Sequence, residues 1–232
     1  MPRQPYLPTF KHLNFAVGAL VLKDRPEHCA AIGKCLSIWG QVDNEMGNLF
    51  ALLLGTESAA ALEVFLSLRR SSNQREALES AAKYKLTGGD LLLFQALLSV
   101  YGSLEKERNG LAHGCFGVCP DDPSILFWID IKDHVHFQTA TLAKEIRGEF
   151  SETDDRHAHL KERLYVYRLP DLETLYLQME EFWFSMFYFN GYLRFPNDPG
   201  RINEMQRVRQ FPKIVETLQK ISSRANSRSL TV

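Results

Sequence analysis

Residues 90–114 read DLLLFQALLSVYGSLEKERNGLAHG, a long apolar-periodic segment that ends in a compact polar motif. Apolar residues recur at the three- and four-residue spacings of one helix face. These residues are Leu92, Leu93, Leu97, Val100, Tyr101 and Leu104. Gly88-Gly89 before the segment predicts a break, and Asp90 is a suitable N-cap. The segment therefore predicts a long helix with one buried face.

The preceding part of the chain has the same helical period. Pro26 suits the first turn of a helix, and an apolar face continues from it through Leu53 until Gly55 closes the helix. Shorter helices are expected over residues 58–68 and from Ser71 or Ser72 through Tyr84. Helices joined by such short connections predict a mainly α fold, an antiparallel bundle of about four helices.

Residues 115–169 change character. Residues 119–123 have the composition of a turn, and three later segments suggest strands because they are rich in β-branched and aromatic residues or alternate in polarity. These segments are residues 125–131, 134–141 and 164–169. They predict a small antiparallel sheet of two or three strands. The charged stretch between them, residues 145–161, is expected to be a loop or an exposed helix.

The two ends of the chain complete a division into four parts. Residues 1–25 are expected to form an N-terminal arm lying against the helical core of residues 26–116, and residues 117–169 form the small β-rich insertion. Residues 170–232 are expected to form C-terminal helices that pack on the core or on a dimer interface. This last part ends in a basic tail, since residues 201–232 hold seven Lys or Arg and two Glu.

Composition limits the class of protein. The chain has 232 residues, 45% of them hydrophobic, and a net charge of −1, so its overall charge does not indicate a nucleic-acid binder. Four cysteines in a chain of this length predict reduced thiols and not a disulfide framework. No signal peptide and no membrane span are expected, which favours a cytoplasmic protein. No Gly-rich phosphate loop is present and no cofactor is expected.

The motif at the end of the long helix carries the chemistry of interest. Arg108 can hold a phosphate with a planar fork of donors, and His113 can exchange a proton near neutral pH. Asn109 and His113 are four residues apart and share a helix face. Arg108 and His113 are five apart, about 140° around the axis. The long Arg side chain, a helix break at Gly110 or Gly114, or a twofold dimer would be needed to bring them together.

The glycines of this motif suggest close packing. Gly110 and Gly114 lie on one ridge, where two missing side chains would let another backbone approach. Gly114 is also expected to end the helix in the left-handed conformation.

Residues 107–114, ERNGLAHG, resemble the R-x(4–6)-H motif of the HEPN superfamily in its common R-N-x-x-A-H form. Residues 37–45, SIWGQVDNE, look like the first core helix of that family, in which a Trp and a following acidic residue are frequent. The resemblance covers roughly residues 27–116. The strands and the apolar helix after this range would be elaborations.

The resemblance implies a dimeric all-α domain, often a metal-independent endoribonuclease of toxin–antitoxin, phage-defence or RNA-processing systems. His113 would be the general acid and base, Arg108 would stabilise charge on the scissile phosphate, and Asn109 would orient the phosphate or the imidazole. The product would be a 2′,3′-cyclic phosphate. Asp43 or Glu45 would line the cleft. RNA and an antitoxin or regulatory protein are the partners that this reading implies, besides a second copy of the chain.

Other interpretations of the same residues stay open. Arg108 and His113 can be a structural pair at a helix end, in a non-catalytic dimeric module that binds a protein or a nucleotide. A zinc site is conceivable, but the spacing of its candidate ligands matches no common zinc signature. Those candidates are His113, Cys115, Cys119, His134 and His136. The basic C-terminal segment could contact a phosphate backbone or be a solvated helix face.

Overall fold

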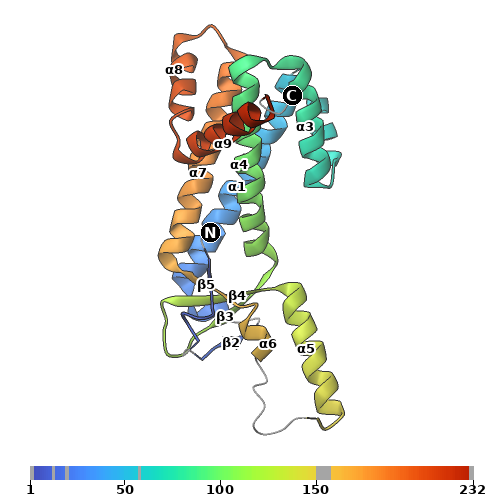
Figure 1. The fold of residues 1–232 in the computed structure, drawn as a ribbon, viewed down its shortest axis with the longest axis vertical. Helices are drawn as coiled ribbons and strands as arrows, with labels where there is room; N and C mark the ends of the chain where they lie inside the picture. Colours follow the sequence, from blue (N-terminus) through green and yellow to red (C-terminus); the bar gives the residue numbers. More distant parts are fainter. Residues whose placement is uncertain (1–2, 12–13, 19–20, 57–58, 150–157, 230–232) are drawn as a thin grey trace. The chain divides into compact units, whose positions relative to one another are not determined.

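The structure is a computed structural model that describes residues 3–11, 14–18, 21–56, 59–149 and 158–229. The chain is mainly α-helical with one small antiparallel sheet, which confirms the predicted fold class (Figure 1). It divides into two compact units. Unit 1 consists of Met1–Leu36 and Glu107–Leu177, and unit 2 of Ser37–Lys106 and Gln178–Val232. The boundaries between the units fall inside α1, α4 and α7, so each of these helices contributes to both units.

The N-terminal helices agree with the sequence pattern. Their bounds are α1 Pro26–Leu53, α2 Ala59–Ser67, α3 Ser71–Lys85 and α4 Gly88–His113. Gly55, with φ of 71°, follows α1 as expected. Asp90 is not the N-cap of α4, because the helix begins two residues earlier at Gly88. Its carboxylate instead accepts a hydrogen bond from the Tyr192 hydroxyl at 3.2 Å and pairs with Arg209.

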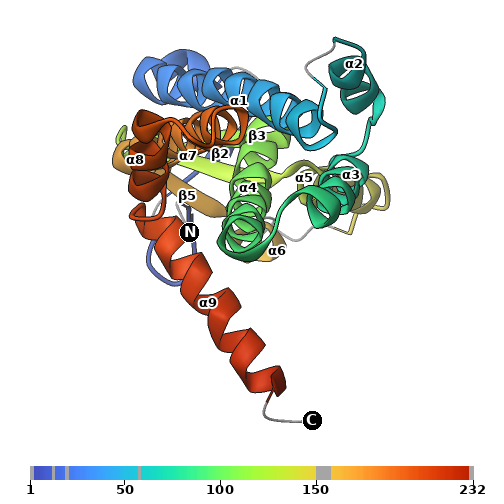
Figure 2. The same ribbon diagram turned by 90° about the horizontal axis from the view of Figure 1, so that it is seen from above.

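The C-terminal segment is helical, as the sequence predicts. α7 covers Leu169–Arg194, α8 covers Pro199–Val208 and α9 covers Pro212–Ser229. The chain from Pro199 onward is thus divided between α8 and α9. Pro212 explains the break, since it has no N–H to continue the hydrogen-bond ladder of α8. Figure 2 shows α9 leaving α8 in a new direction.

Aromatic side chains from three helices are in contact in the core of unit 2. The Trp39 ring lies 5.3 Å from that of Tyr101, which in turn lies 6.3 Å from Phe182. The contacts Tyr101–Phe182 and Asp90–Tyr192 require α4 and α7 to run in opposite directions. Figures 1 and 2 both show these helices side by side with α1. Trp39 is thus a core residue of a helical bundle.

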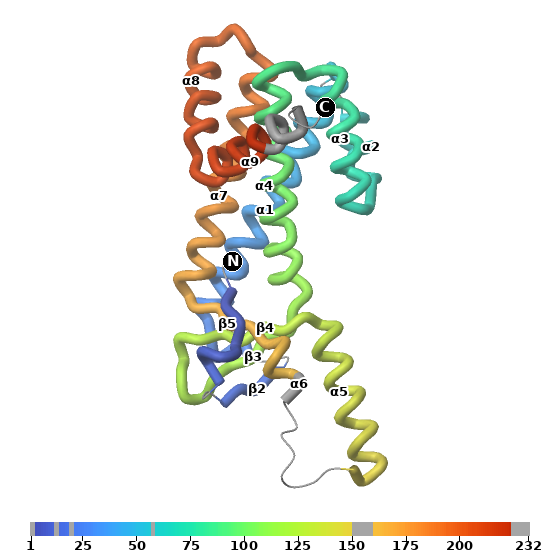
Figure 3. Tube along the Cα trace, in the orientation of Figure 1, coloured from blue at the N-terminus to red at the C-terminus, as the bar shows by residue number. Residues whose placement is uncertain are grey.

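Unit 1 contains the sheet, whose strands are ordered β1-β5-β4-β3-β2 and pair antiparallel. Figure 3 labels β2, β3, β4 and β5 along the Cα trace of this unit. The strands are β1 Gln4–Pro5, β2 Ala16–Val17, β3 Gly114–Val118, β4 Ile125–Asp130 and β5 Tyr165–Arg168. Within the described residues the sheet is therefore larger than the predicted two or three strands. Residues of the N-terminal segment supply both edge strands, since β1 pairs with β5 and β2 pairs with β3.

The central strand β4 is buried on both faces. Its residues from Ile125 to Ile129 are all buried. Every second residue of the strand, Ile125, Phe127 and Ile129, packs into a cluster with Tyr6 and Val166. Trp128 points to the opposite face of the sheet, beside Tyr165. A strand covered on both sides has no polar face, and this explains the continuous apolar run in its sequence.

The predicted strand over residues 134–141 is wrong, because this stretch lies in the helix α5, Ile131–Ile146. Asp130 caps the helix, since its carboxylate accepts a hydrogen bond from the Lys132 backbone N–H at 2.9 Å. α5 has no buried residues and projects from the end of β4 (Figures 1 and 3). Of the charged stretch 145–161, residues 150–157 lie outside the described residues, and Ala158–Lys161 form α6.

Gly114 does not end α4 in the left-handed conformation, because it is the first residue of β3 and its φ is not positive. A different constraint requires a glycine here. A Cβ atom built on Gly114 would lie 1.7 Å from Nε1 of Trp128. The indole therefore occupies the space that any side chain at this position would need.

Replacement of this glycine should disrupt the packing of the indole. Gly114→Ala is expected to lower the free energy of unfolding by about 1–3 kcal/mol, because the added methyl group forces Trp128 to move. Gly33→Ala is the matched control, since an added Cβ there meets no atom within 4 Å in α1. It should stabilise the protein by about 0.5–1 kcal/mol, because alanine favours the helix. Urea denaturation measures the free energy of unfolding of both variants. An unchanged free energy of unfolding in Gly114→Ala would contradict the packing described.

Candidate active site

The motif of residues 108–113 forms the last turns of α4 within unit 1. The helix continues through Gly110 and ends at His113, so it has no break that would turn Arg108 toward His113. The two residues therefore leave the helix about 140° apart. The Arg108 guanidinium donates a hydrogen bond to Oδ1 of Asn109 at 2.8 Å. A single chain thus brings Arg108 and Asn109 together but not Arg108 and His113.

His113 is an exposed side chain in the last turn of α4. Within the described part of the chain, its ring makes no hydrogen bond or ion pair. The side-chain oxygen of Asn109 is used by Arg108 and not by His113. The imidazole is thus available to a ligand or a second molecule.

Trp128 of β4 contacts this end of α4. Its indole Nε1–H donates a hydrogen bond to the backbone carbonyl of Gly110 at 2.8 Å. The same ring covers Gly114, as described above. The ridge formed by Gly110 and Gly114 therefore accepts an indole ring, and the predicted approach of another backbone is wrong for the single chain. The hydrogen bond also satisfies a carbonyl that the helix end leaves without an intrahelical donor.

Arg3 lies over the ring of this indole. Its guanidinium carbon lies 3.9 Å from the centroid of the Trp128 ring and 5.3 Å from that of Tyr165. These distances are typical of cation–π contacts. A Cβ atom on Gly110 would lie 2.8 Å from Nη1 of Arg3. The N-terminal arm thus reaches the helix that carries the motif.

A group of polar atoms without partners lies in the same unit. Nη1 of Arg3, Oε2 of Glu107 and the hydroxyl of Tyr167 are buried and have no hydrogen-bond partner among the described residues. Burial raises the pKa of Tyr167 well above its usual value. The charge of Arg3 lowers this pKa to a smaller extent, and the charge of Glu107 raises it. The phenol therefore stays protonated and able to donate. Neither Arg3 nor Trp128 is suggested by the sequence, because both act through contacts between distant segments.

Asp43 and Glu45 belong to unit 2 and have partners there. The Tyr101 hydroxyl donates to Asp43 at 3.5 Å, and the Asn190 amide donates to Glu45 at 2.7 Å. The prediction that one of them lines the cleft of the motif stays a prediction.

The four cysteines are free thiols. Cys119 and Cys115 contribute to the apolar cluster of unit 1. Burial raises the pKa of the Cys115 thiol, and the Asp130 carboxylate raises it further. Burial also raises the pKa of Cys35 to about 11. Across the described ranges, no three His, Cys, Asp or Glu side chains are grouped in a way that could hold a metal ion.

Comparison with protein-family models, with curated proteins and with solved structures gives no match to this chain. Among the helices that the structure describes, none has the length and apolar character needed to cross a bilayer.

His28 is a buried titratable group that the sequence pattern does not reveal. Its Nε2 lies 3.2 Å from the backbone carbonyl of Ser124, so the ring donates a hydrogen bond when Nε2 carries the proton. Burial lowers the pKa of His28 below its usual 6.5, against the raising effect of this hydrogen bond, and the Arg25 charge lowers it further. The folded state therefore favours the neutral ring.

This shift makes stability depend on pH. Between the folded pKa of His28 and 6.5, the unfolded chain binds more protons than the folded chain, so the free energy of unfolding falls as the pH falls through this window. His28→Gln keeps a hydrogen-bond donor but cannot titrate. This variant should therefore show a smaller change in stability with pH over the same window. His136→Gln, at an exposed position of α5, is the control and should leave the profile unchanged. Calorimetric melting temperatures between about pH 5 and 8 test this, and identical profiles for wild type and His28→Gln would refute it.

Proposed function

We propose that the chain is a metal-independent endoribonuclease of HEPN type. His113 takes the proton of a ribose 2′-OH, the alkoxide attacks the adjacent phosphorus, and the 5′-oxygen leaves with a proton. The product carries a 2′,3′-cyclic phosphate. Arg108 stabilises the charge that develops on the phosphate, and Asn109 positions either the phosphate or the guanidinium. The observation that carries this proposal is the exposed, unpartnered imidazole of His113 on the helix end that also bears Arg108 and Asn109.

The proposed site requires two copies of the chain. Because Arg108 and His113 diverge by about 140° on a continuous helix, Arg108 of one copy would meet His113 of another across a twofold axis. A surface of unit 1 supports association. Four exposed apolar residues of α5 lie on one side of the helix, at spacings of four and seven residues. They are Ile131, Val135, Leu142 and Ile146. A contact between copies would remove this apolar stripe from water.

The cellular setting follows the same resemblance. A ribonuclease of this type would act in the cytoplasm, in toxin–antitoxin or phage-defence systems. An antitoxin or another regulatory protein would then hold it inactive by covering the exposed imidazole.

One observation favours a second candidate function, a non-catalytic dimeric module that binds a protein or a nucleotide. The Arg108 guanidinium is half-buried and donates to Asn109 in the single chain. The guanidinium would have to give up this hydrogen bond, at least in part, in order to donate to a bound phosphate. In a structural role, Arg108 would keep it.

Cleavage of RNA in the presence of EDTA distinguishes the two functions. Wild-type protein is expected to cut a mixture of single-stranded and structured RNA and to leave cyclic-phosphate ends. His113→Ala should slow cleavage at least about 100-fold by removing the acid–base group. Arg108→Ala should slow it about 100- to 1,000-fold by removing stabilisation of the phosphate charge.

Matched controls separate catalysis from general surface effects. His136→Ala and Arg70→Ala remove exposed side chains of the same types and should leave cleavage unchanged. Circular dichroism should give similar melting curves for all variants. Equal cleavage by wild type and His113→Ala would contradict the mechanism, and no cleavage by wild type would favour the non-catalytic module.

A further inference from the structure

A cavity of about 220 Å³ lies within unit 2. Residues of α1 and α7 line it, together with Phe195, just after α7, and Arg201 of α8. Its wall combines an acid, amides, basic groups and phenyl rings. The residues that define its chemistry are Glu45, Asn48, Asn190, Arg194, Arg201 and Phe187. This chemistry is unrelated to the proposed ribonuclease motif.

The acidic side of the cavity consists of Glu45 and Asn190, which are 8% and 6% exposed. The Asn190 amide donates to the backbone carbonyl of Glu45 at 2.9 Å and to its Oε2 at 2.7 Å. Among the described residues, no cationic nitrogen lies within 4 Å of the Glu45 carboxylate, although a buried carboxylate is normally paired. Oδ1 of Asn190 is buried and has no hydrogen-bond donor in the same part of the chain. The Glu45 carboxylate thus lacks a cationic partner, and Oδ1 of Asn190 lacks a hydrogen-bond donor.

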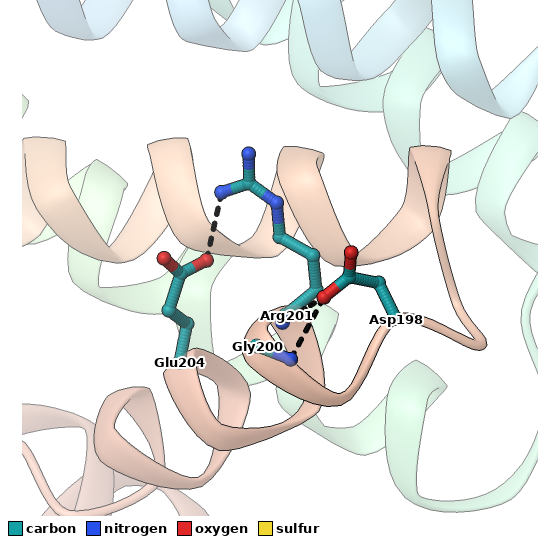
Figure 4. A network of polar contacts seen from close by, with 4 residues as sticks. All are labelled: Asp198, Gly200, Arg201 and Glu204. Carbon is teal, nitrogen blue, oxygen red and sulfur yellow. Dashed lines mark hydrogen bonds and ion pairs between the residues drawn. The ribbon is translucent and has the colours of Figure 1, made fainter.

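The basic side of the cavity is held in place by α8. The Asp198 carboxylate caps this helix by accepting from the backbone N–H groups of Gly200 at 2.7 Å and Arg201 at 3.1 Å (Figure 4). The Arg201 guanidinium extends away from the cap and donates to Glu204 at 2.8 Å. It rests on the backbone of α7, where a Cβ on Gly191 would lie 3.0 Å from its Nη1. A guanidinium positioned in this way is suited to a carboxylate.

Aromatic side chains complete the wall. Phe187 and Phe195 both line the cavity and are exposed to solvent. They offer an apolar surface between groups of opposite charge. The wall thus offers guanidinium groups and the carboxylate of Glu45 to the same ligand. A ligand that carries both a positive and a negative charge can use both kinds of group.

We propose that this cavity binds a small zwitterion with the chemistry of a free α-amino acid. Its ammonium group donates to Glu45, and its carboxylate accepts from Arg201. An apolar side chain lies against Phe187 and Phe195. The bound ammonium supplies the cation that the buried Glu45 lacks.

Isothermal titration calorimetry of the full-length protein with each standard L-α-amino acid tests this proposal. At least one of them should bind. Its N-acetylated and its C-terminally amidated forms should bind at least about tenfold more weakly, because each lacks one of the two charges. A nucleoside monophosphate series is the rival probe, and binding of that series without binding of any amino acid would overturn the proposal.

Two variants locate the site. Glu45→Gln keeps an oxygen that accepts from Asn190 and should fold normally, but it should weaken binding of the amino acid at least about tenfold. Arg201→Ala should weaken it to a similar extent. Glu79→Gln and Arg70→Ala change exposed residues of α3 and of the position before it, and they should bind as wild type does. No binding of any amino acid, or equal binding by wild type and Glu45→Gln, would overturn the proposal.

Discussion

The indole of Trp128 is the constraint on which the candidate active site depends. It donates a hydrogen bond to the carbonyl of Gly110 and fills the space beside Gly114, so α4 is held as a regular helix until it meets β3. Because the helix does not bend, Arg108 and His113 stay on different sides of it. Arg108 donates to Asn109 in this structure, and the proposed function therefore invokes a second copy of the chain to complete the catalytic pair.

Much of the fold could be predicted from the periodicity of the sequence. α1 and α4 each bury one face, and a regular three- and four-residue spacing of apolar residues reports this directly. β4 was predicted because its apolar run is short and rich in β-branched and aromatic residues. The edge strands of the N-terminal arm were missed, since two-residue strands have no pattern of their own. Residues 134–141 of α5 were mistaken for a strand because they partly alternate in polarity. The helical spacing of the apolar residues of α5 extends over the longer range from Ile131 to Ile146.

The residues of the candidate sites also differ in whether the sequence alone could reveal them. Arg108, Asn109 and His113 could be singled out because they are close together in the sequence and their chemistry is local. Trp128 and Arg3 could not, since they reach the motif from β4 and from the N-terminal arm. Glu45 was expected to line the cleft of the motif by resemblance alone. Its position beside Asn190 in unit 2 depends on contacts between residues that are 145 apart in the sequence, which no local pattern encodes.

The central claim is that two chains share each ribonuclease site, and mixing inactive variants tests it most directly. Arg108→Ala and His113→Ala proteins would be purified separately, unfolded, mixed in equal amounts and refolded together. If Arg108 of one copy acts with His113 of the other, about half of the dimers are mixed and hold one intact site, which restores about a quarter of the wild-type cleavage rate. No cleavage of RNA by the mixture, under conditions in which refolded wild type is active, would contradict the shared site.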